Sequence, residues 1–268
     1  RIQQAKEDGK STGIVMTMGA LHAGHVSLVK QCTEQCDFTV VTIFVNPTQF
    51  MPGEDFEDYP RQFEQDLMAM QDCPVDVVFA PTDEEMYGES FSTYIQPPAV
   101  GTNLEGVCRP GHFRGVCTVV FKLLQAAPVD IAFFGQKDYQ QLQVIKHMVA
   151  DLDVGVDVRG CVTVREADGL AMSSRNQYLS EDDRRKATAI SRSLHLAAEM
   201  VDEGETSAAA ISARMRQELA DAGISKIDYV AIADARTLEE VREVTEGTMA
   251  LIAAHVGTTR LIDNKQIM

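Results

Sequence analysis

The feature that most constrains the fold is a repeated alternation of short apolar segments with amphipathic ones in the first part of the chain. Residues 38–45 (FTVVTIFV) are almost entirely apolar, which is typical of a strand whose two faces are both covered. Further apolar runs occur at 13–18, 75–80 and 130–134, and apolar residues at helical spacing lie between them. Strands separated by helices predict right-handed β–α–β units and therefore a parallel sheet.

The pattern changes near Val164, where the strand–helix alternation stops. A long helix is predicted from Ser180 to about Val201, and a second one ends near Gly223. Three strand-like runs follow, at 228–233, 249–256 and 259–262. The chain is therefore predicted to be an α/β protein. A Rossmann-like parallel-sheet domain is expected over 1–163, and a smaller α+β domain over 164–268.

Charge and hydropathy narrow the classes of function. The 268 residues carry a formal net charge of −16, which disfavours binding to nucleic acid or to anionic lipid. No run approaches the roughly 18 apolar residues of a membrane span. The first residues, RIQQAKEDGKSTG, lack the apolar centre of a signal peptide. The six cysteines form no C-x-x-C pair, so we expect reduced, buried thiols and a cytoplasmic protein.

The segment after the first predicted strand has the features of an anion site. It reads Met18-Gly19-Ala20-Leu21-His22-Ala23-Gly24-His25 and leads into a helix. Ligands of open α/β sheets bind beyond the carboxyl ends of strands, and a helix start offers N–H groups to an anion. Gly19 and Gly24 permit close backbone approach, and His22 and His25 are spaced to face one ligand. Their N–H groups would stabilise charge on a phosphate during transfer. Two surface histidines in a turn remain the alternative interpretation.

A second phosphate-binding segment is predicted far downstream, at Met172-Ser173-Ser174-Arg175. Two hydroxyl groups and a guanidinium can donate several hydrogen bonds to phosphate oxygens. Asp168 and Gly169 mark a turn before it, so the segment is expected to move and to close over ATP. The first segment resembles the HIGH signature of the adenylyl-transferring Rossmann-like superfamily, and this one resembles its KMSKS loop.

Four further stretches narrow the resemblance to one family. They are Thr42–Phe50 (TIFVNPTQF), Arg109–Val116 (RPGHFRGV), Phe134–Gln141 (FGQKDYQQ) and Arg260–Asn264 (RLIDN). Together with the two segments above, they make the chain similar to the pantothenate synthetases over essentially its whole length.

The resemblance implies a reaction and its requirements. Pantoate attacks the α-phosphate of ATP, which yields pantoyl adenylate and pyrophosphate; β-alanine then attacks the acyl carbon and releases AMP. It also implies Mg²⁺, a cytoplasmic location and a homodimer. The domain that carries Ser173, Ser174 and Arg175 is expected to act as a lid.

Residue roles follow from matching positions in the family. Gln49 and Gln141 match its pantoate-binding glutamines; neutral amides can orient a carboxylate without lowering its nucleophilicity as a tight arginine pair would. Lys137 matches its phosphate-binding lysine. The expected catalytic residues are His22, His25, Lys137, Ser173, Ser174 and Arg175. The expected ATP-binding residues add Met18, Gly19, Gly24, Gly135, Asp138 and Met172.

Five residues have further or alternative assignments. Met18 is also expected to pack against the methyl groups of pantoate, and Asn46 to reach the ligand from the end of its strand. Arg109 and His112 border the active site in the family, but pairing with nearby carboxylates is an equal alternative. Asp66 is the candidate Mg²⁺ ligand, although a lone aspartate on a helix is usually a solvated charge.

Three rival interpretations of these motifs exist. Another adenylyltransferase of the superfamily would share the histidines and the Ser-Ser-Arg segment but not Gln49 and Gln141. A fragment of an aminoacyl-tRNA synthetase is disfavoured by the charge and by the absence of an anticodon-binding region. A non-catalytic nucleotide-binding module would bind ATP without reacting it with any acid.

Overall fold

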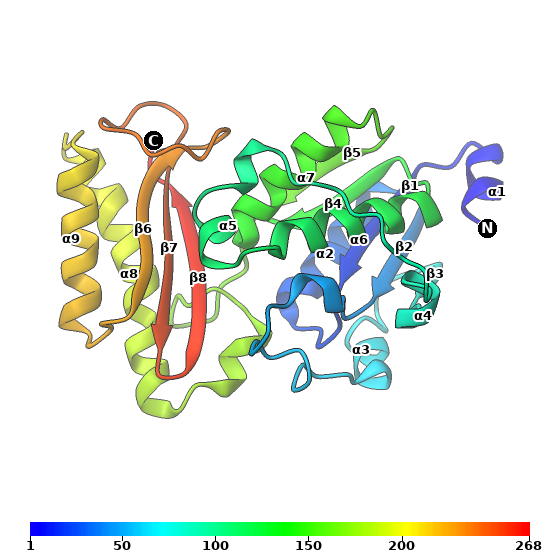
Figure 1. Cartoon of the computed structure of the whole chain (residues 1–268), viewed down its shortest axis with the longest axis horizontal. Coiled ribbons are helices and arrows are strands. Elements are labelled where there is room, and N and C mark those ends of the chain that lie inside the picture. Colours follow the sequence, from blue (N-terminus) through cyan, green and yellow to red (C-terminus); the bar gives the residue numbers. More distant parts are fainter. The chain divides into compact units, whose positions relative to one another are not determined.

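The computed structural model describes residues 1–268 and divides into two compact units. The first comprises residues 1–136 and 140–162, and the second comprises residues 137–139 and 163–268 (Figure 1). Residues 137–139 therefore belong to the second unit, although the residues on either side of them belong to the first. One of the three, Lys137, is a predicted site residue.

The first unit is built on a five-stranded parallel sheet with the order β3-β2-β1-β4-β5. Its strands are β1 (Thr12–Thr17), β2 (Phe38–Ile43), β3 (Val77–Phe79), β4 (Ile131–Gly135) and β5 (Asp157–Cys161). The chain builds outward from β1 through β2 to β3, and then returns to the other side of β1 with β4. The strand order reverses between β1 and β4, and the carboxyl ends beside such a reversal are where open α/β sheets bind ligands.

Helices connect these strands, as the sequence predicts. They are α2 (Ala23–Gln35), α3 (Phe63–Ala69), α4 (Asp83–Met86), α5 (Glu105–Cys108), α6 (His112–Ala126) and α7 (Tyr139–Asp151), and α1 (Ile2–Glu7) precedes the first strand. Short 3-10 helices occupy Pro47–Gln49, Ala99–Gly101 and Gln136–Asp138. The core includes Val15, Val29, Val41 and Phe133. Five of the six cysteines are buried, and burial raises the pKa of Cys32 to about 12, so its thiol stays protonated.

The second unit is an antiparallel sheet covered by two helices. Its strands, in the order β6-β7-β8, are β6 (Ile227–Asp234), β7 (Thr248–Val256) and β8 (Thr259–Gln266). The helices α8 (Glu181–Asp202) and α9 (Ala208–Asp221) pack on one side of this sheet (Figure 1). Ser180 and Ser207 cap them, and their buried faces meet β6 and β7 in a core that includes Ile190 and Ile211. The α/β fold with a smaller α+β part is thereby confirmed.

One strand was not predicted. The strand β5 reads DVRGC, and its exposed Asp157 and Arg159 hide the apolar pattern. It lies at the edge of the sheet, where one side of the strand has no neighbour and polar residues are tolerated.

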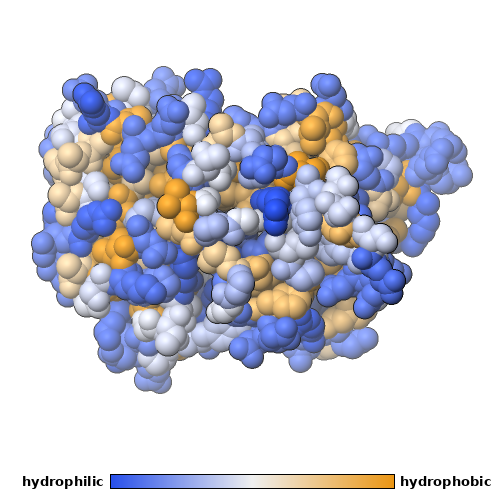
Figure 2. Space-filling view, viewed as in Figure 1, coloured by the Kyte–Doolittle hydropathy of each residue, from blue (hydrophilic) through white to orange (hydrophobic).

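No helix is both long and apolar enough to cross a membrane. On the face drawn in Figure 2, hydrophobic residues lie in small groups among hydrophilic ones.

Candidate active site

The turn after β1 is held in an unusual conformation by a buried carboxylate. Gly19 and Ala20 have positive φ angles of 80° and 51°. Asp66, on α3, is 1% exposed and accepts hydrogen bonds from the backbone N–H of Ala20 (3.2 Å) and of Leu21 (2.8 Å). A Cβ atom on Gly19 would lie 2.9 Å from a carboxylate oxygen of Asp66. Gly19 is therefore required both for its backbone angle and for this close approach.

His22 and His25 lie against each other at the start of α2. Their ring centroids are 4.1 Å apart, and the rings are stacked at 27°. Nδ1 of His22 accepts from the backbone N–H of Gly24 (3.1 Å), and Nδ1 of His25 accepts from the backbone N–H of His22 (3.4 Å). These bonds assign the proton of each neutral ring to Nε2. The helix start thus carries two Nε2–H donors side by side, which suits an anion.

Gln49 is buried at the end of the segment that follows β2, and its amide has a defined orientation. Its oxygen accepts a hydrogen bond from Nδ2 of Asn46 (3.0 Å), and its Nε2 points to the sulfur of Met18 (3.0 Å). Asn46 is only 1% exposed, and its own oxygen accepts from the hydroxyl of Tyr87 (2.7 Å). The predicted residues Met18, Asn46 and Gln49 are therefore in contact, and Tyr87 completes the arrangement.

The loop that carries Arg109 and His112 holds the backbone of Gln49. Nδ1 of the buried His112 lies 2.9 Å from the carbonyl oxygen of Gln49 and donates to it, while Nε2 lies 3.2 Å from Nη1 of Arg109. Arg109 forms a two-point ion pair with Glu54, with both distances 2.7 Å. Burial and the neighbouring Arg109 lower the pKa of His112 to about 4, so the ring is neutral at physiological pH. Burial raises the pKa of Glu54, but the hydrogen bonds and positive charge of Arg109, together with the backbone N–H of Met51, outweigh it and leave the pKa below its ordinary value.

Two adjacent glutamines at the start of α7 differ in their surroundings. Gln140 is buried, and its amide contacts the carbonyl oxygens of Val100 and Asn103 and the N–H of Glu105. Gln140 therefore fixes a neighbouring loop. Gln141 is half-buried and forms none of these bonds, so its amide is available to a ligand. Gly135 ends β4 just before this turn, and a Cβ atom there would meet nothing within 4 Å.

The second unit carries the remaining predicted residues. Lys137 and Asp138 lie in the 3-10 turn that follows β4, with a loose Nζ–Oδ1 distance of 3.9 Å between them. Ser173 caps the 3-10 helix Ser174–Tyr178 by accepting from the N–H of Arg175 (3.3 Å). The predicted turn before this segment is present, with Gly169 at a φ of +89°.

The profile of the family described as pantoate–beta-alanine ligase matches residues 1–266. The chain belongs to this family.

Individual members of the ligase family are similar to this chain over nearly their whole length. The pantothenate synthetase of Rhodopirellula baltica is 47% identical over 269 residues, covering 99% of this chain and 94% of the relative. That of Moorella thermoacetica is 48% identical, covering 98% and 93%. A crystal structure of the Thermus thermophilus protein has a TM-score of 0.94 at 41% identity, covering 99% and 97%. The Francisella tularensis ligase, solved in complex with β-γ ATP and β-alanine, has a TM-score of 0.79 at 32% identity, covering 100% and 96%.

Most of the predicted residues of this ligase fall into two local groups, whereas Gly135 and Gln141 lie at the end of β4 and near the start of α7. In the first unit, the turn after β1 carries His22 and His25, and Met18 contacts Gln49, which binds Asn46. In the second unit, Lys137, Asp138 and the segment 172–175 belong to one compact body. The sequence gives no indication of Glu54 and Tyr87, which bind the candidate site residues Arg109 and Asn46. A charge or a tyrosine in a loop gives no signal of its partner, so only the fold reveals these roles.

Proposed function

We propose that this chain condenses pantoate with β-alanine at the expense of ATP, through a pantoyl-adenylate intermediate. Membership of the pantoate–beta-alanine ligase family supports the substrates. The arrangement that carries the chemistry is the pair of stacked histidines with Nε2–H donors at a helix start, beside a buried turn. Such donors, fixed before the substrate arrives, stabilise charge that develops on phosphate oxygens.

In the first step, a carboxylate oxygen of pantoate attacks the α-phosphorus of ATP, and the bond to pyrophosphate breaks. We assign His22 and His25 to the phosphate oxygens, where their Nε2–H groups would oppose the growing negative charge. Lys137, Ser173, Ser174 and Arg175 are assigned to the phosphates as further donors. The backbone at Gly19, Gly24 and Gly135, with Met172 and Asp138, is assigned to the remainder of the nucleotide.

The two glutamines are assigned to pantoate. The amide of Gln49 presents its NH₂ group on the side of Met18, because Asn46 occupies its oxygen. Gln141 presents an amide that the protein does not use. Neutral donors orient the carboxylate but leave its charge available for attack. Met18 would then offer an apolar contact to the methyl groups of pantoate.

In the second step, the amine of β-alanine attacks the acyl carbon of the adenylate. The bond between the acyl carbon and the bridging oxygen breaks, and AMP leaves with that oxygen. The amine loses a proton as the amide forms. The same donors that oppose charge on the α-phosphate in the first step would stabilise the departing AMP.

We also propose that Mg²⁺ binds together with the phosphates of ATP. No cluster of three or more histidine, cysteine or acidic side chains converges in the structure. The carboxylate of Asp66 already accepts two backbone N–H groups, so the predicted metal role of Asp66 is not carried forward. Mg²⁺ is commonly bound through substrate phosphates with few protein ligands, and this chain fits that mode.

The family resemblance also supports a cytoplasmic homodimer.

The reaction can be tested by exchange of labelled pyrophosphate into ATP. Exchange should require pantoate and should proceed without β-alanine, because only the first step is being reversed. If another acid supports exchange and pantoate does not, the chain is a different adenylyltransferase. If ATP binds but no acid supports exchange, the chain is a binding module.

A further inference from the structure

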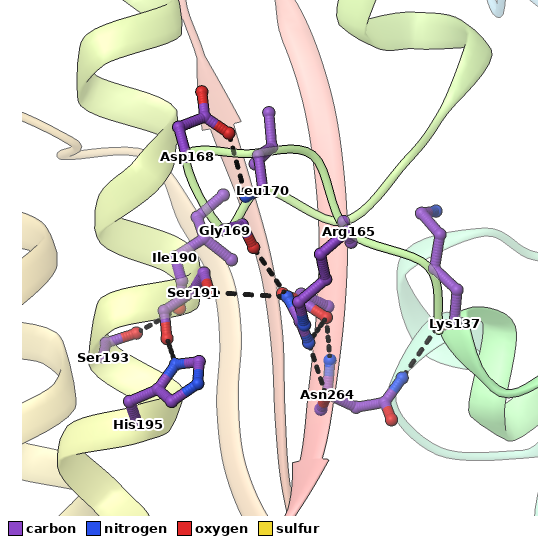
Figure 3. Close-up of polar contacts among 12 residues, drawn as sticks. Lys137, Arg165, Asp168, Gly169, Leu170, Ile190, Ser191, Ser193, His195 and Asn264 are labelled. Carbon is purple, nitrogen blue, oxygen red and sulfur yellow. Dashed lines mark hydrogen bonds and ion pairs between the residues drawn. The ribbon is translucent and has the colours of Figure 1, made fainter. Parts of the chain in front are cut away.

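The RLIDN motif at Arg260–Asn264 has no place in the mechanism above, although it is one of the stretches that define the family resemblance. It forms the middle of β8, and its last two residues are buried, Asp263 at 3% and Asn264 at 8% exposure. Figure 3 shows Asn264 on this strand and Arg165 next to it, with Lys137 on one side and the turn at Gly169 on the other. Buried polar side chains are costly unless they satisfy specific partners.

We propose that Asp263 and Asn264 are positioning residues, which hold the turn of Lys137 and the base of the Ser-Ser-Arg segment in one fixed relation. The inference rests on the proposed function, in which both of these elements bind the phosphates of ATP. It assigns no contact with substrate to Asp263 or Asn264.

Asn264 acts on the lysine turn directly. Its Nδ2 donates a hydrogen bond of 2.8 Å to the backbone carbonyl oxygen of Lys137. A second contact is made by Tyr139, whose hydroxyl donates to the carbonyl oxygen of Ala235 (3.0 Å). These bonds explain why residues 137–139 group with the second unit, although the chain on either side belongs to the first. A fixed carbonyl at residue 137 fixes the direction in which its side chain leaves the backbone.

Asp263 acts on the other element through Arg165. Its two oxygens accept from Nη1 (2.7 Å) and Nη2 (3.0 Å) of Arg165, and one of them also accepts from the N–H of Asn264 (2.8 Å). Nη1 of Arg165 donates further to the carbonyl oxygen of Gly169 (3.0 Å) and reaches Oγ of Ser191 (3.4 Å). A planar guanidinium suits this role, because its donors have fixed directions.

Residues 164–172 form a hairpin that includes Arg165 and ends at the start of the Ser-Ser-Arg segment. Arg165 and Ala171 form a β-bridge, and the N–H of Met172 donates to the carbonyl oxygen of Val164 (2.9 Å). Beyond the segment, Asn176 donates to the carbonyl oxygen of Ala171 (3.1 Å). Backbone pairing therefore joins Ala171 and Met172, next to Ser173, to the strand of Arg165, and hydrogen bonds continue from Arg165 through Asp263 and Asn264 to Lys137. The ion pair between Arg165 and Asp263 belongs to this series. A buried ion pair often adds little to folding stability, so a positioning role gives a reason for its presence.

The test measures ATP affinity by titration calorimetry without pantoate. Asn264→Asp keeps the size of the side chain but replaces the NH₂ donor with a second oxygen facing the carbonyl of Lys137. We expect it to weaken ATP binding about tenfold, as for loss of one buried hydrogen bond. Gln266→Glu is the matched control. It makes the same change on β8 at an amide that donates only to Met268, and should leave affinity within about twofold.

A double-mutant cycle separates positioning from general stability. If Asn264 acts through Lys137, then Asn264→Asp should weaken ATP binding by less than about twofold in a Lys137→Ala background. If the same factor is lost in both backgrounds, or if Asn264→Asp alone leaves affinity unchanged, the proposal is overturned. Should Asn264→Asp fail to fold, Tyr139→Phe removes the second contact of the turn. It should weaken ATP binding about threefold, and unchanged affinity would equally overturn the proposal.

The outcome is separable from that of the proposed reaction. Wild-type protein that binds ATP but shows no pantoate-dependent exchange would refute the reaction and leave the positioning role standing. Wild-type protein that exchanges pyrophosphate, with an affinity for ATP insensitive to Asn264→Asp, would refute only the positioning role. Wild-type protein that does not bind ATP would refute both.

Discussion

Nδ2 of Asn46 donates a hydrogen bond of 3.0 Å to Oε1 of Gln49, and this contact decides which end of the Gln49 amide points away from Asn46. An isolated glutamine could present either its oxygen or its NH₂ group. With Asn46 as donor, and with Tyr87 bound to the oxygen of Asn46, only one orientation satisfies all three side chains. Gln49 therefore presents a donor, which is what a carboxylate requires.

The first prediction concerns this orientation. Asn46→Asp places an acceptor against the oxygen of Gln49, so the amide should turn over and offer its oxygen to the carboxylate of pantoate. We expect the KM for pantoate to rise about tenfold while the KM for ATP changes less than about twofold. Tyr87→Phe keeps the bond between Asn46 and Gln49 and should raise the KM for pantoate about threefold at most. Steady-state kinetics checks both. An unchanged KM for pantoate in Asn46→Asp would show that this bond does not set the orientation.

The second prediction concerns the turn after β1. Gly19 and Gly9 both have positive φ angles, so alanine at either position should cost about 1 kcal/mol of folding stability. Only at Gly19 would the added methyl meet a carboxylate oxygen of Asp66 and displace the turn. Gly19→Ala should therefore lose at least about tenfold in adenylation rate, whereas Gly9→Ala should keep it. Equal rates in the two variants, measured by pyrophosphate exchange, would remove Asp66 from the organisation of the turn.

The third prediction concerns the stacked histidines. His25→Ala removes an Nε2–H donor and should lower the rate of pyrophosphate exchange by about 10²-fold or more. His147, an exposed residue of α7, serves as the control, and His147→Ala should leave the rate within about twofold. A His25→Ala rate near that of the control would exclude His25 from the mechanism.

The fourth prediction is a pH dependence of stability that originates at His112. Its pKa is about 4 in the folded protein against 6.5 for an ordinary histidine, because it is buried beside Arg109. As the pH falls from 6.5 to 4, the unfolded chain takes up a proton that the folded protein refuses, so stability decreases across this window. At about 1.4 kcal/mol per pKa unit, the loss at this site amounts to about 3 kcal/mol.

Urea unfolding at about pH 7 and about pH 4.5 measures this loss. Other groups titrate over the same range, so the relevant quantity is the difference between wild type and His112→Gln, which cannot take up the proton. The variant should lose about 2–3 kcal/mol less than wild type between the two pH values. Equal losses in the two proteins would place the pH dependence elsewhere.

The sequence predicts well those features that depend on local pattern. The strand β2 (Phe38–Ile43) is evident from the apolar run at residues 38–45 because both of its faces are buried, and the turn at Gly169 because Asp and Gly favour it. The edge strand β5 escapes prediction, because its polar residues face solvent. The bond of Asn264 to the carbonyl of Lys137 also escapes it, since it joins positions 127 residues apart in the chain.

The candidate site shows the same contrast between local pattern and long-range contacts. The two histidines and the Ser-Ser-Arg segment are candidates that residue type and order alone indicate. The structure adds what fixes them, such as the carboxylate of Asp66 beneath the turn of Gly19. It also separates Gln140, whose amide is consumed by the protein, from its neighbour Gln141. Neither distinction can be made from a sequence, because both depend on which groups from distant segments come together.

The central claim is that pantoate is activated by adenylation, and the path of one oxygen atom tests it most directly. Pantoate labelled with ¹⁸O in its carboxylate is incubated with ATP, Mg²⁺, β-alanine and the protein, and the products are analysed by mass spectrometry. The attacking oxygen becomes the bridge of the adenylate and leaves with the phosphate, so AMP should carry one ¹⁸O atom for each pantothenate formed. Unlabelled AMP, or label in inorganic phosphate, would contradict an adenylate intermediate.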